Sequence, residues 1–227
     1  MAENGKLLAS TLFPDSTPPA PAMNVNPTAL DFRLAATGPQ IRVIEIIPGQ
    51  IVTRQSIEAS PVVDGRVVSD PDRDLLKIAV VERHRRTGRT GIGFVKGLGL
   101  RRGAIASSVA HDAHNIIVVG ATDRDMLAAV RHVIDMQGGL VVVKDEKIQA
   151  SLALPIAGLM SPQPIRSIQK QLTALTRAAQ DLGISLPDPF MTLSFLALPV
   201  IPELKITDLG LVDVNRFEPV DLFIQKR

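Results

Sequence analysis

The stretch from residue 101 to residue 125 constrains the fold more than any other part of the chain. Two apolar runs, residues 104–110 and 116–119, flank the polar pentapeptide His111-Asp112-Ala113-His114-Asn115. Burying ionisable groups between packed segments costs free energy unless they are paired or bind something. Loops held by a rigid scaffold are also where function is often found. The stretch therefore predicts two packed segments joined by a functional loop, with a helix starting after Gly120.

Turn residues and hydrophobic alternation predict an α+β fold, with a mixed β-sheet and two main helices. The predicted strands are residues 41–47, 51–57, 62–68 (a hairpin around Asp64-Gly65), 75–81, 92–95, 116–119, 140–143, 148–154, 209–214 and 220–224. One helix is expected to open with Thr122 and Asp125, the other with an N-cap at Ser161 before Pro162. Residues 188–197 fit either a helical turn or a strand. The unit 116–143 predicts a parallel strand pair with a right-handed crossover.

The first 40 residues follow a different pattern. Asn4-Gly5 is a favoured hairpin turn, but so few residues precede it that the first strand is expected to be missing. An extended, poorly packing linker is predicted from the prolines that follow: Pro14, Pro18, Pro19, Pro21 and Pro27.

Composition limits the chemistry. The 227 residues include no cysteine, which excludes disulfides and thiolate chemistry and leaves His, Asp, Glu, Asn or water as metal ligands. A cytoplasmic location is expected, because cysteine is absent and no basic-then-apolar segment opens the chain. The apolar runs are too short or too interrupted by proline to span a bilayer, so no membrane partner is expected.

Positive charge is concentrated in residues 83–102, which contain arginine and lysine but no acidic residue. Such a run would suit nucleic acid electrostatically. Phe94 is the only aromatic residue there that could stack on a base, so we prefer a solvated or subunit-facing patch.

His111 and His114 are three residues apart, so a helical turn or tight loop would put both imidazoles on one side. There they could share a metal ion or a polar ligand, with Asp112 and Asn115 adding oxygen donors. The alternative is that these groups cap the following element and pair with one another.

Glu82 and His84 follow the apolar strand 75–81 and share one face. They either join a site with the His111 loop or form an exposed strand end, and the exposed end is preferred. His132, beside the core position Val133, is expected to be a surface histidine. The glycine-rich run 88–103 lacks both the dinucleotide fingerprint and a Walker lysine, so it gives little support for phosphate binding.

Four motifs occur in order along the chain: residues 106–115 (ASSVAHDAHN), 154–161 (LPIAGLMS), 195–202 (FLALPVIP) and 207–214 (TDLGLVDV). Together they resemble the C-terminal domain of bacterial adenine deaminases, and the similarity extends from about residue 41 to residue 223. This family is a branch of the amidohydrolase superfamily. The resemblance implies hydrolysis of adenine to hypoxanthine and ammonia by a divalent metal, manganese or iron, held in a TIM-like barrel.

The barrel's metal ligands include a His-x-His pair, which this chain does not contain. Residues 2–8 resemble the segment that follows the barrel. The resemblance therefore implies that residues 1–40 are a remnant of the barrel-flanking β-subdomain with a proline-rich linker. Residues 41–227 are then the C-terminal domain, which is expected to be inactive without a barrel.

The resemblance also places the His111 loop near the mouth of the active site. His111 and Asp112 are the expected catalytic contacts, and His111 and His114 are the candidate metal ligands. Residues expected to bind the substrate or to orient those contacts are His114, Asn115, Ser108 and Glu82. The expected substrate is adenine or a related purine, and the expected partner is a second copy or a separate barrel chain. The alternative is a non-catalytic module that binds purine or metal or serves in oligomerisation.

Overall fold

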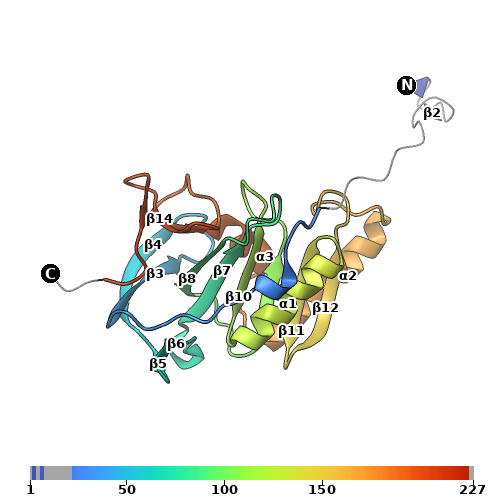
Figure 1. The fold of residues 1–227 in the computed structure, drawn as a ribbon. Coiled ribbons are helices and arrows are strands. Elements are labelled where there is room, and N and C mark those ends of the chain that lie inside the picture. Colours follow the sequence, from blue (N-terminus) through green and yellow to red (C-terminus); the bar gives the residue numbers. More distant parts are fainter. Residues whose placement is uncertain (1, 4–5, 8–21, 225–227) are drawn as a thin grey trace.

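The structure, a computed structural model, describes residues 2–3, 6–7 and 22–224. Eight strands form its central sheet: β3 Gln40–Ile46, β4 Thr53–Ala59, β7 Leu76–Val81, β8 Thr90–Lys96, β9 Ala104–Ser107, β10 Ile116–Gly120, β11 Gly139–Lys144 and β12 Lys147–Ala153. Their order across the sheet is β12-β11-β9-β10-β7-β8-β3-β4 (Figure 1). Neighbouring strands are antiparallel except for the parallel pair β3 and β8. The predicted α+β fold with a mixed sheet is confirmed.

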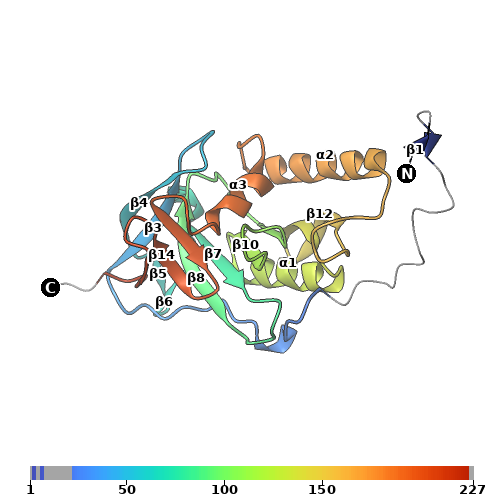
Figure 2. The ribbon, with the colours of Figure 1, turned by 90° about the horizontal axis from the view of Figure 1, so that it is seen from above.

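Helices cover both faces of this sheet (Figure 2). α1 Asp123–Asp135 lies on one face, and α2 Ile165–Asp181 and α3 Pro189–Leu196 lie on the other. Successive side chains of a strand point to opposite faces. In β7, Ile78 and Val80 therefore join the core under α2 and α3, while Ala79 and Val81 join the core under α1. Burial on both faces explains why the central strands are mostly apolar, with the buried Lys77 of β7 and Ser107 of β9 as exceptions.

Smaller sheets flank the central one. β13 Leu204–Thr207, β14 Gly210–Asp213 and β15 Glu218–Val220 form an antiparallel sheet whose Leu204, Ile206 and Leu211 share the core of α2 and α3. The remaining short elements are β1 Ala2–Glu3, β2 Lys6–Leu7, β5 Val62–Val63, β6 Arg66–Val67 and the 3₁₀ turns Pro27–Ala29 and Pro71–Arg73. Pairing of β5 with β6 confirms the predicted Asp64-Gly65 hairpin. Within the described ranges, no helix is both long enough and apolar enough to cross a membrane.

One expectation about the N-terminal segment is wrong. A first strand does precede residue 4, since Ala2 pairs with Leu7 and Glu3 with Lys6. Farther along, Met23 and Phe32 are buried against the α1 face, in the same core as the side chains of that helix, whereas Pro27 is exposed. The linker prolines Pro14, Pro18, Pro19 and Pro21 lie outside the described residues.

The helix starts agree with the sequence for α1 but not for α2. The Thr122 hydroxyl accepts the backbone N–H of Asp125 at 3.1 Å, as predicted. α2 does not open after Ser161; it begins at Ile165, with Pro164 at the N-cap. A residue preceding proline avoids the helical region, so Pro164 prevents an earlier start. The segment left open as a turn or strand is a third helix, α3, capped by the Asp188 carboxylate.

The strand–helix–strand unit is arranged differently from the prediction. β10 and β11 do run in the same direction, because both are antiparallel to β9, but β9 lies between them. They are therefore not hydrogen-bonded neighbours. The polar segment that follows β9 lets the chain reverse into an antiparallel β9–β10 pair, and the other edge of β9 is then free for β11.

Candidate functional site

A hollow of ≈ 170 Å³ lies at one end of the central strands, where the β9–β10 loop, α3 and the β13–β14 turn meet. Its lining residues are Val80, Ala110, His111, Asp112, Ala113, Asn115, Ala197, Pro199, Thr207 and Asp208. Three of the predicted site residues, His111, Asp112 and Asn115, are thus brought together. The volume of this hollow is below the about 300–1,000 Å³ of typical small-molecule sites.

The first part of the β9–β10 loop is held by α3. The backbone N–H of His111 donates to the Ser194 carbonyl at 3.2 Å. Its imidazole lies 4.9 Å from the Phe195 ring and 5.6 Å from the His114 ring, measured between centroids. Asp112, between the two histidines, is exposed.

His114 closes the loop in a left-handed conformation, with φ of +50°. Its N–H donates to the Ala110 carbonyl at 2.6 Å, and its Nδ1 is buried with no partner among the described residues. Burial lowers the pKa of His114, and the positive charges of His111 and Arg83 lower it further. The neutral imidazole is therefore favoured at this position.

Asn115 connects this loop to two segments that the sequence did not associate with it. Its Oδ1 accepts the backbone N–H of Arg83 at 3.3 Å, and its Nδ2 donates to Asp208 Oδ1 at 3.3 Å. Asp208 lies 93 residues away in sequence and was not singled out as a site residue. It lies in the motif 207–214, but nothing local to that motif indicated a contact with the His111 loop.

Arg83 is the second residue that sequence reasoning missed, because it was counted within the basic run. Its side chain is buried and donates to the carbonyls of His114, Ala22 (2.6 Å) and Ala157 (3.0 Å). Burial lowers the pKa of Arg83. The sequence offered one indication of this role for Arg83, its position just after the apolar strand 75–81. An arginine at a buried strand end must be paired with other polar groups.

Glu82 and Ser108 do not line the hollow. Burial would raise the pKa of the Glu82 carboxyl, but hydrogen bonds from Thr87, Arg85 and His84 outweigh it and lower the pKa to about 2. The Ser108 hydroxyl donates to the Gly158 carbonyl at 2.5 Å and accepts the Gly139 N–H at 2.8 Å. Both side chains therefore use their polar atoms to hold neighbouring loops.

His84 touches the loop directly, whereas His132 lies in a helix on one face of the sheet and does not line the hollow. The Nε2 of His84 lies 2.7 Å from the Ala113 carbonyl oxygen. His132 is in α1, half-buried, and its Nε2 is buried without a partner in the part of the chain that is described.

The residues present do not fit a metal ion by themselves. Catalytic zinc ions, for comparison, typically take three protein ligands. Within the described ranges, no group of three His, Cys, Asp or Glu side chains could hold an ion. His111 and His114 therefore remain a pair, and further ligands would have to come from outside this domain.

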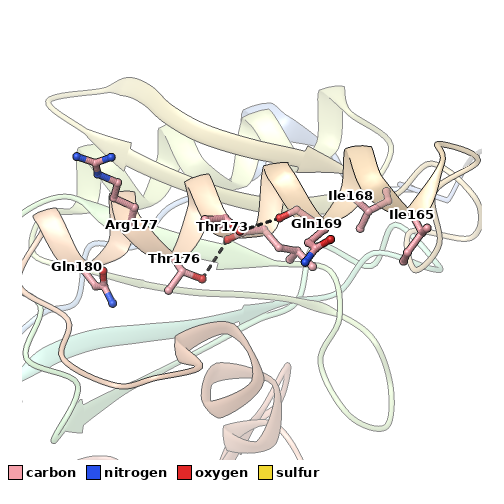
Figure 3. A pocket seen from close by; sticks show the side chains of 8 residues that line it. Ile165, Ile168, Gln169, Thr173, Thr176, Arg177 and Gln180 are labelled. Carbon is pink, nitrogen blue, oxygen red and sulfur yellow. Dashed lines mark hydrogen bonds between the residues drawn. The ribbon is translucent and has the colours of Figure 1, made fainter.

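A larger groove of ≈ 660 Å³ runs along α2 (Figure 3). Its lining residues are Ile165, Ile168, Gln169, Leu172, Thr173, Thr176, Arg177 and Gln180. It contains no carboxylate or imidazole, so it offers no acid–base group and suits contact better than catalysis.

The basic run is divided among separate partners. Lys96 bonds the Glu58 carboxylate at 2.9 Å, Arg101 bonds the Pro71 carbonyl at 2.8 Å, and Arg102 bonds the Asp181 carbonyl at 3.1 Å. Three residues of the run thus contact three different segments of the fold.

Comparison with known proteins gives one consistent result. A family model described as "Adenine deaminase C-terminal domain" matches residues 50–218. Relatives named adenine deaminase include those of Desulfatibacillum aliphaticivorans, 53% identical over 98% of this chain and 39% of the relative, and Methanothrix thermoacetophila, 51% identical over 99% and 40%. A protein of Carboxydothermus hydrogenoformans named adenine deaminase 2 is 47% identical over 97% of this chain and 39% of its own length. The chain thus spans about two fifths of the length of these curated relatives.

Proposed function

This chain belongs to the adenine deaminase C-terminal domain family, and from that premise we propose that it is part of an enzyme that hydrolyses adenine to hypoxanthine and ammonia. We also propose that the β9–β10 loop faces the reaction centre, which the rest of such an enzyme supplies. Purine metabolism is then its biochemical setting, and the cysteine-free composition suits the cytoplasm.

The observation that carries this proposal is a hollow with fixed polar groups but only part of a binding site's volume. His111, Asn115 and Asp208 line it and are each held by bonds to other segments. Val200 and Leu209 follow the lining residues Pro199 and Asp208 in sequence and are 58% and 66% exposed. Exposed apolar side chains next in sequence to residues that line the hollow favour a further protein surface covering it.

Deamination requires water oxygen to bond to C6 of the purine and the C6–N bond to break. One proton must leave the water and one must reach the departing amine. We assign this transfer to His111, because an imidazole that lines the hollow can both accept and donate a proton. Asp112, exposed at the loop, accepts a hydrogen bond from the ligand, while the mainly neutral His114 lies against the His111 ring.

Asn115, Ser108 and Glu82 take supporting roles. Asn115 fixes the end of the loop, whereas Ser108 and Glu82 hold the backbone around it. The family implies a divalent metal, manganese or iron, in the catalytic portion. The two imidazoles of this chain are too few to hold that metal.

A second function is favoured by the α2 groove. Ile165 and Leu172, both in its lining, are 78% and 40% exposed. This chain would then act as a non-catalytic module that contacts a second copy or another chain.

The test is ammonia release from adenine in the presence of manganese. We would replace the C-terminal two fifths of the Desulfatibacillum aliphaticivorans relative by this chain, and assay the chimaera beside the isolated chain. We expect activity from the chimaera and none from the chain alone. His111→Ala in the chimaera should lower kcat/KM by about 100-fold or more, as removal of a proton-transfer group does. His132→Ala, at a histidine of α1 that does not line the hollow, is the matched control. An unchanged rate with His111→Ala would contradict the catalytic role of the loop.

A further inference from the structure

The β13–β14 turn is seated directly on strand β8. A Cβ atom placed on Gly91 would come within 2.0 Å of the Thr207 carbonyl oxygen and 2.6 Å of the Gly210 nitrogen. Only glycine allows this approach. Within the turn, the Thr207 hydroxyl accepts the Leu209 N–H at 3.2 Å. The intervening residue, Asp208, therefore projects from a segment that is fixed relative to the central sheet.

From this turn, a continuous series of hydrogen bonds reaches the β9–β10 loop. Asp208 Oδ1 accepts from Asn115 Nδ2, Asn115 Oδ1 accepts from the backbone N–H of Arg83, and Arg83 Nε donates to the His114 carbonyl. The other carboxylate oxygen of Asp208 is 3.8 Å from Arg89 Nε. The Asp208 side chain is 18% exposed, so solvent competes little for these contacts.

The two carboxylates that line the hollow, those of Asp112 and Asp208, differ in how they are held by the protein. Asp112 is exposed, and its carboxylate has no hydrogen-bond partner among the described residues. Asp208 is anchored at both oxygens. A carboxylate held in this way can fix a neighbouring amide in one orientation.

We propose that Asp208 is the positioning residue of the β9–β10 loop: by binding Asn115 it fixes the end of the loop, and thereby the direction in which His111 faces the hollow. Its catalytic consequence rests on the function proposed above, whereas the loop geometry does not. α3 holds the beginning of the loop through the Ser194 carbonyl, and Asp208 holds its end. His111 lies between these two attachments.

The test of loop order uses this chain alone. Amide hydrogen exchange at His114 and the ring-proton shifts of His111, which packs on Phe195, report the loop by NMR. In Asp208→Ala we expect exchange at His114 to be at least about tenfold faster, the size expected for losing one charge-assisted hydrogen bond. We also expect the His111 shifts to move toward solvent-exposed values. Asp208→Asn keeps an acceptor for Asn115 and should behave like wild type. Asp112→Asn, which removes a charge from the same hollow without breaking a bond, should too.

A reciprocal exchange guards against loss of folding in Asp208→Ala. Asn115→Asp alone sets two carboxylates against each other and should accelerate exchange at His114. Combining it with Asp208→Asn restores a donor–acceptor pair and should return exchange to within about twofold of wild type. Unchanged exchange in Asp208→Ala, or no recovery in the double variant, would overturn the proposal.

Activity in the chimaera separates this proposal from the proposed function. Asp208→Ala should lower kcat by about tenfold or more with a smaller change in KM, and Asp208→Asn should rescue it. Faster exchange without any loss of kcat would support positioning by Asp208 while removing the loop from catalysis. Loss of kcat with unaltered exchange would overturn the positioning role.

Discussion

Replacement of Arg83 by methionine should destabilise the fold and loosen the β9–β10 loop at the same time. The guanidinium is buried and donates to three carbonyls, those of His114, Ala22 and Ala157, which come from three separate segments. No carboxylate in the described part of the chain pairs with it. Methionine has a similarly long, unbranched side chain but no donor, so all three carbonyls would lose this partner.

The expected cost follows from two opposing contributions. Hydrogen bonds to a charged group contribute about 1.5–3 kcal/mol each, which for three bonds is about 5–9 kcal/mol. Methionine also removes the desolvation penalty of a buried charge, which is several kcal/mol. The net loss in free energy of unfolding should be about 3 kcal/mol. For a chain of 227 residues, this lowers Tm by about 6–12 °C.

Urea and thermal unfolding of four proteins would measure it: wild type, Arg83→Met, Arg83→Lys and Arg85→Met. Arg83→Lys keeps the charge, but one ammonium cannot reach three separated carbonyls, so an intermediate loss is expected. Arg85 is exposed and serves as the matched control, with a change within about 0.5 kcal/mol. A loss below about 1 kcal/mol for Arg83→Met, or an equal loss for Arg85→Met, would refute the reasoning.

Two further predictions concern buried ionisable groups. Burial lowers the pKa of Lys205 from 10.5 to about 8. Between pH 8 and 10.5 the unfolded chain therefore holds a proton on Lys205 that the folded chain has lost. The free energy of unfolding should rise with pH across that window by about 3 kcal/mol relative to Lys205→Met. A difference between the two proteins that stays constant from pH 7 to 11 would contradict this. The pKa of Glu82 is about 2, below its ordinary 4.5, because hydrogen bonds outweigh burial. The ionised Glu82 carboxylate should contribute about 3 kcal/mol to the free energy of unfolding above pH 4.5, and this contribution should be lost as pH falls toward 2. In urea unfolding, the difference in stability between wild type and Glu82→Gln should therefore shrink with falling pH. A difference that does not change with pH would contradict the prediction.

The sequence predicted those elements whose causes are local. β7 was recognisable because both of its faces are buried, so five of its six residues are apolar, with Lys77 as the exception. The start of α1 was recognisable because Thr122 satisfies a backbone N–H three residues later. The predicted start of α2 was wrong, because the preference of Ser161-Pro162 for opening a helix was overridden by the second proline, Pro164. The predicted pairing of β10 with β11 was wrong for a different reason. Whether β9 lies between these two strands depends on pairing between distant segments, and the alternation of apolar and polar residues does not encode such pairing.

The hollow also combines residues that a local sequence pattern indicates with residues that only distant contacts bring there. The His111 loop could be found because its polar residues are adjacent in sequence and lie between apolar runs. Asp208 could not, because its contact with Asn115 spans 93 residues and needs the β13–β14 turn to reach β8. Arg83 could not be separated from the other arginines, because its partners are backbone carbonyls, which have no signature in a sequence.

The energetics of the loop favour a role beyond holding the fold together. His114 Nδ1 is buried without a partner in the described part of the chain. An unsatisfied buried polar atom costs about 1–3 kcal/mol, and each such group in a native structure calls for a physical reason. Lys77 shows how this fold treats a charge whose role is structural, since its ammonium is paired with both Asp123 and the Phe32 carbonyl. The backbone of the β9–β10 loop is held from both ends, whereas His114 Nδ1 has no partner in the described part of the chain and the Asp112 carboxylate is exposed to solvent. A loop that is fixed in position and leaves these groups without a protein partner agrees with the proposed place of the loop beside a reaction centre.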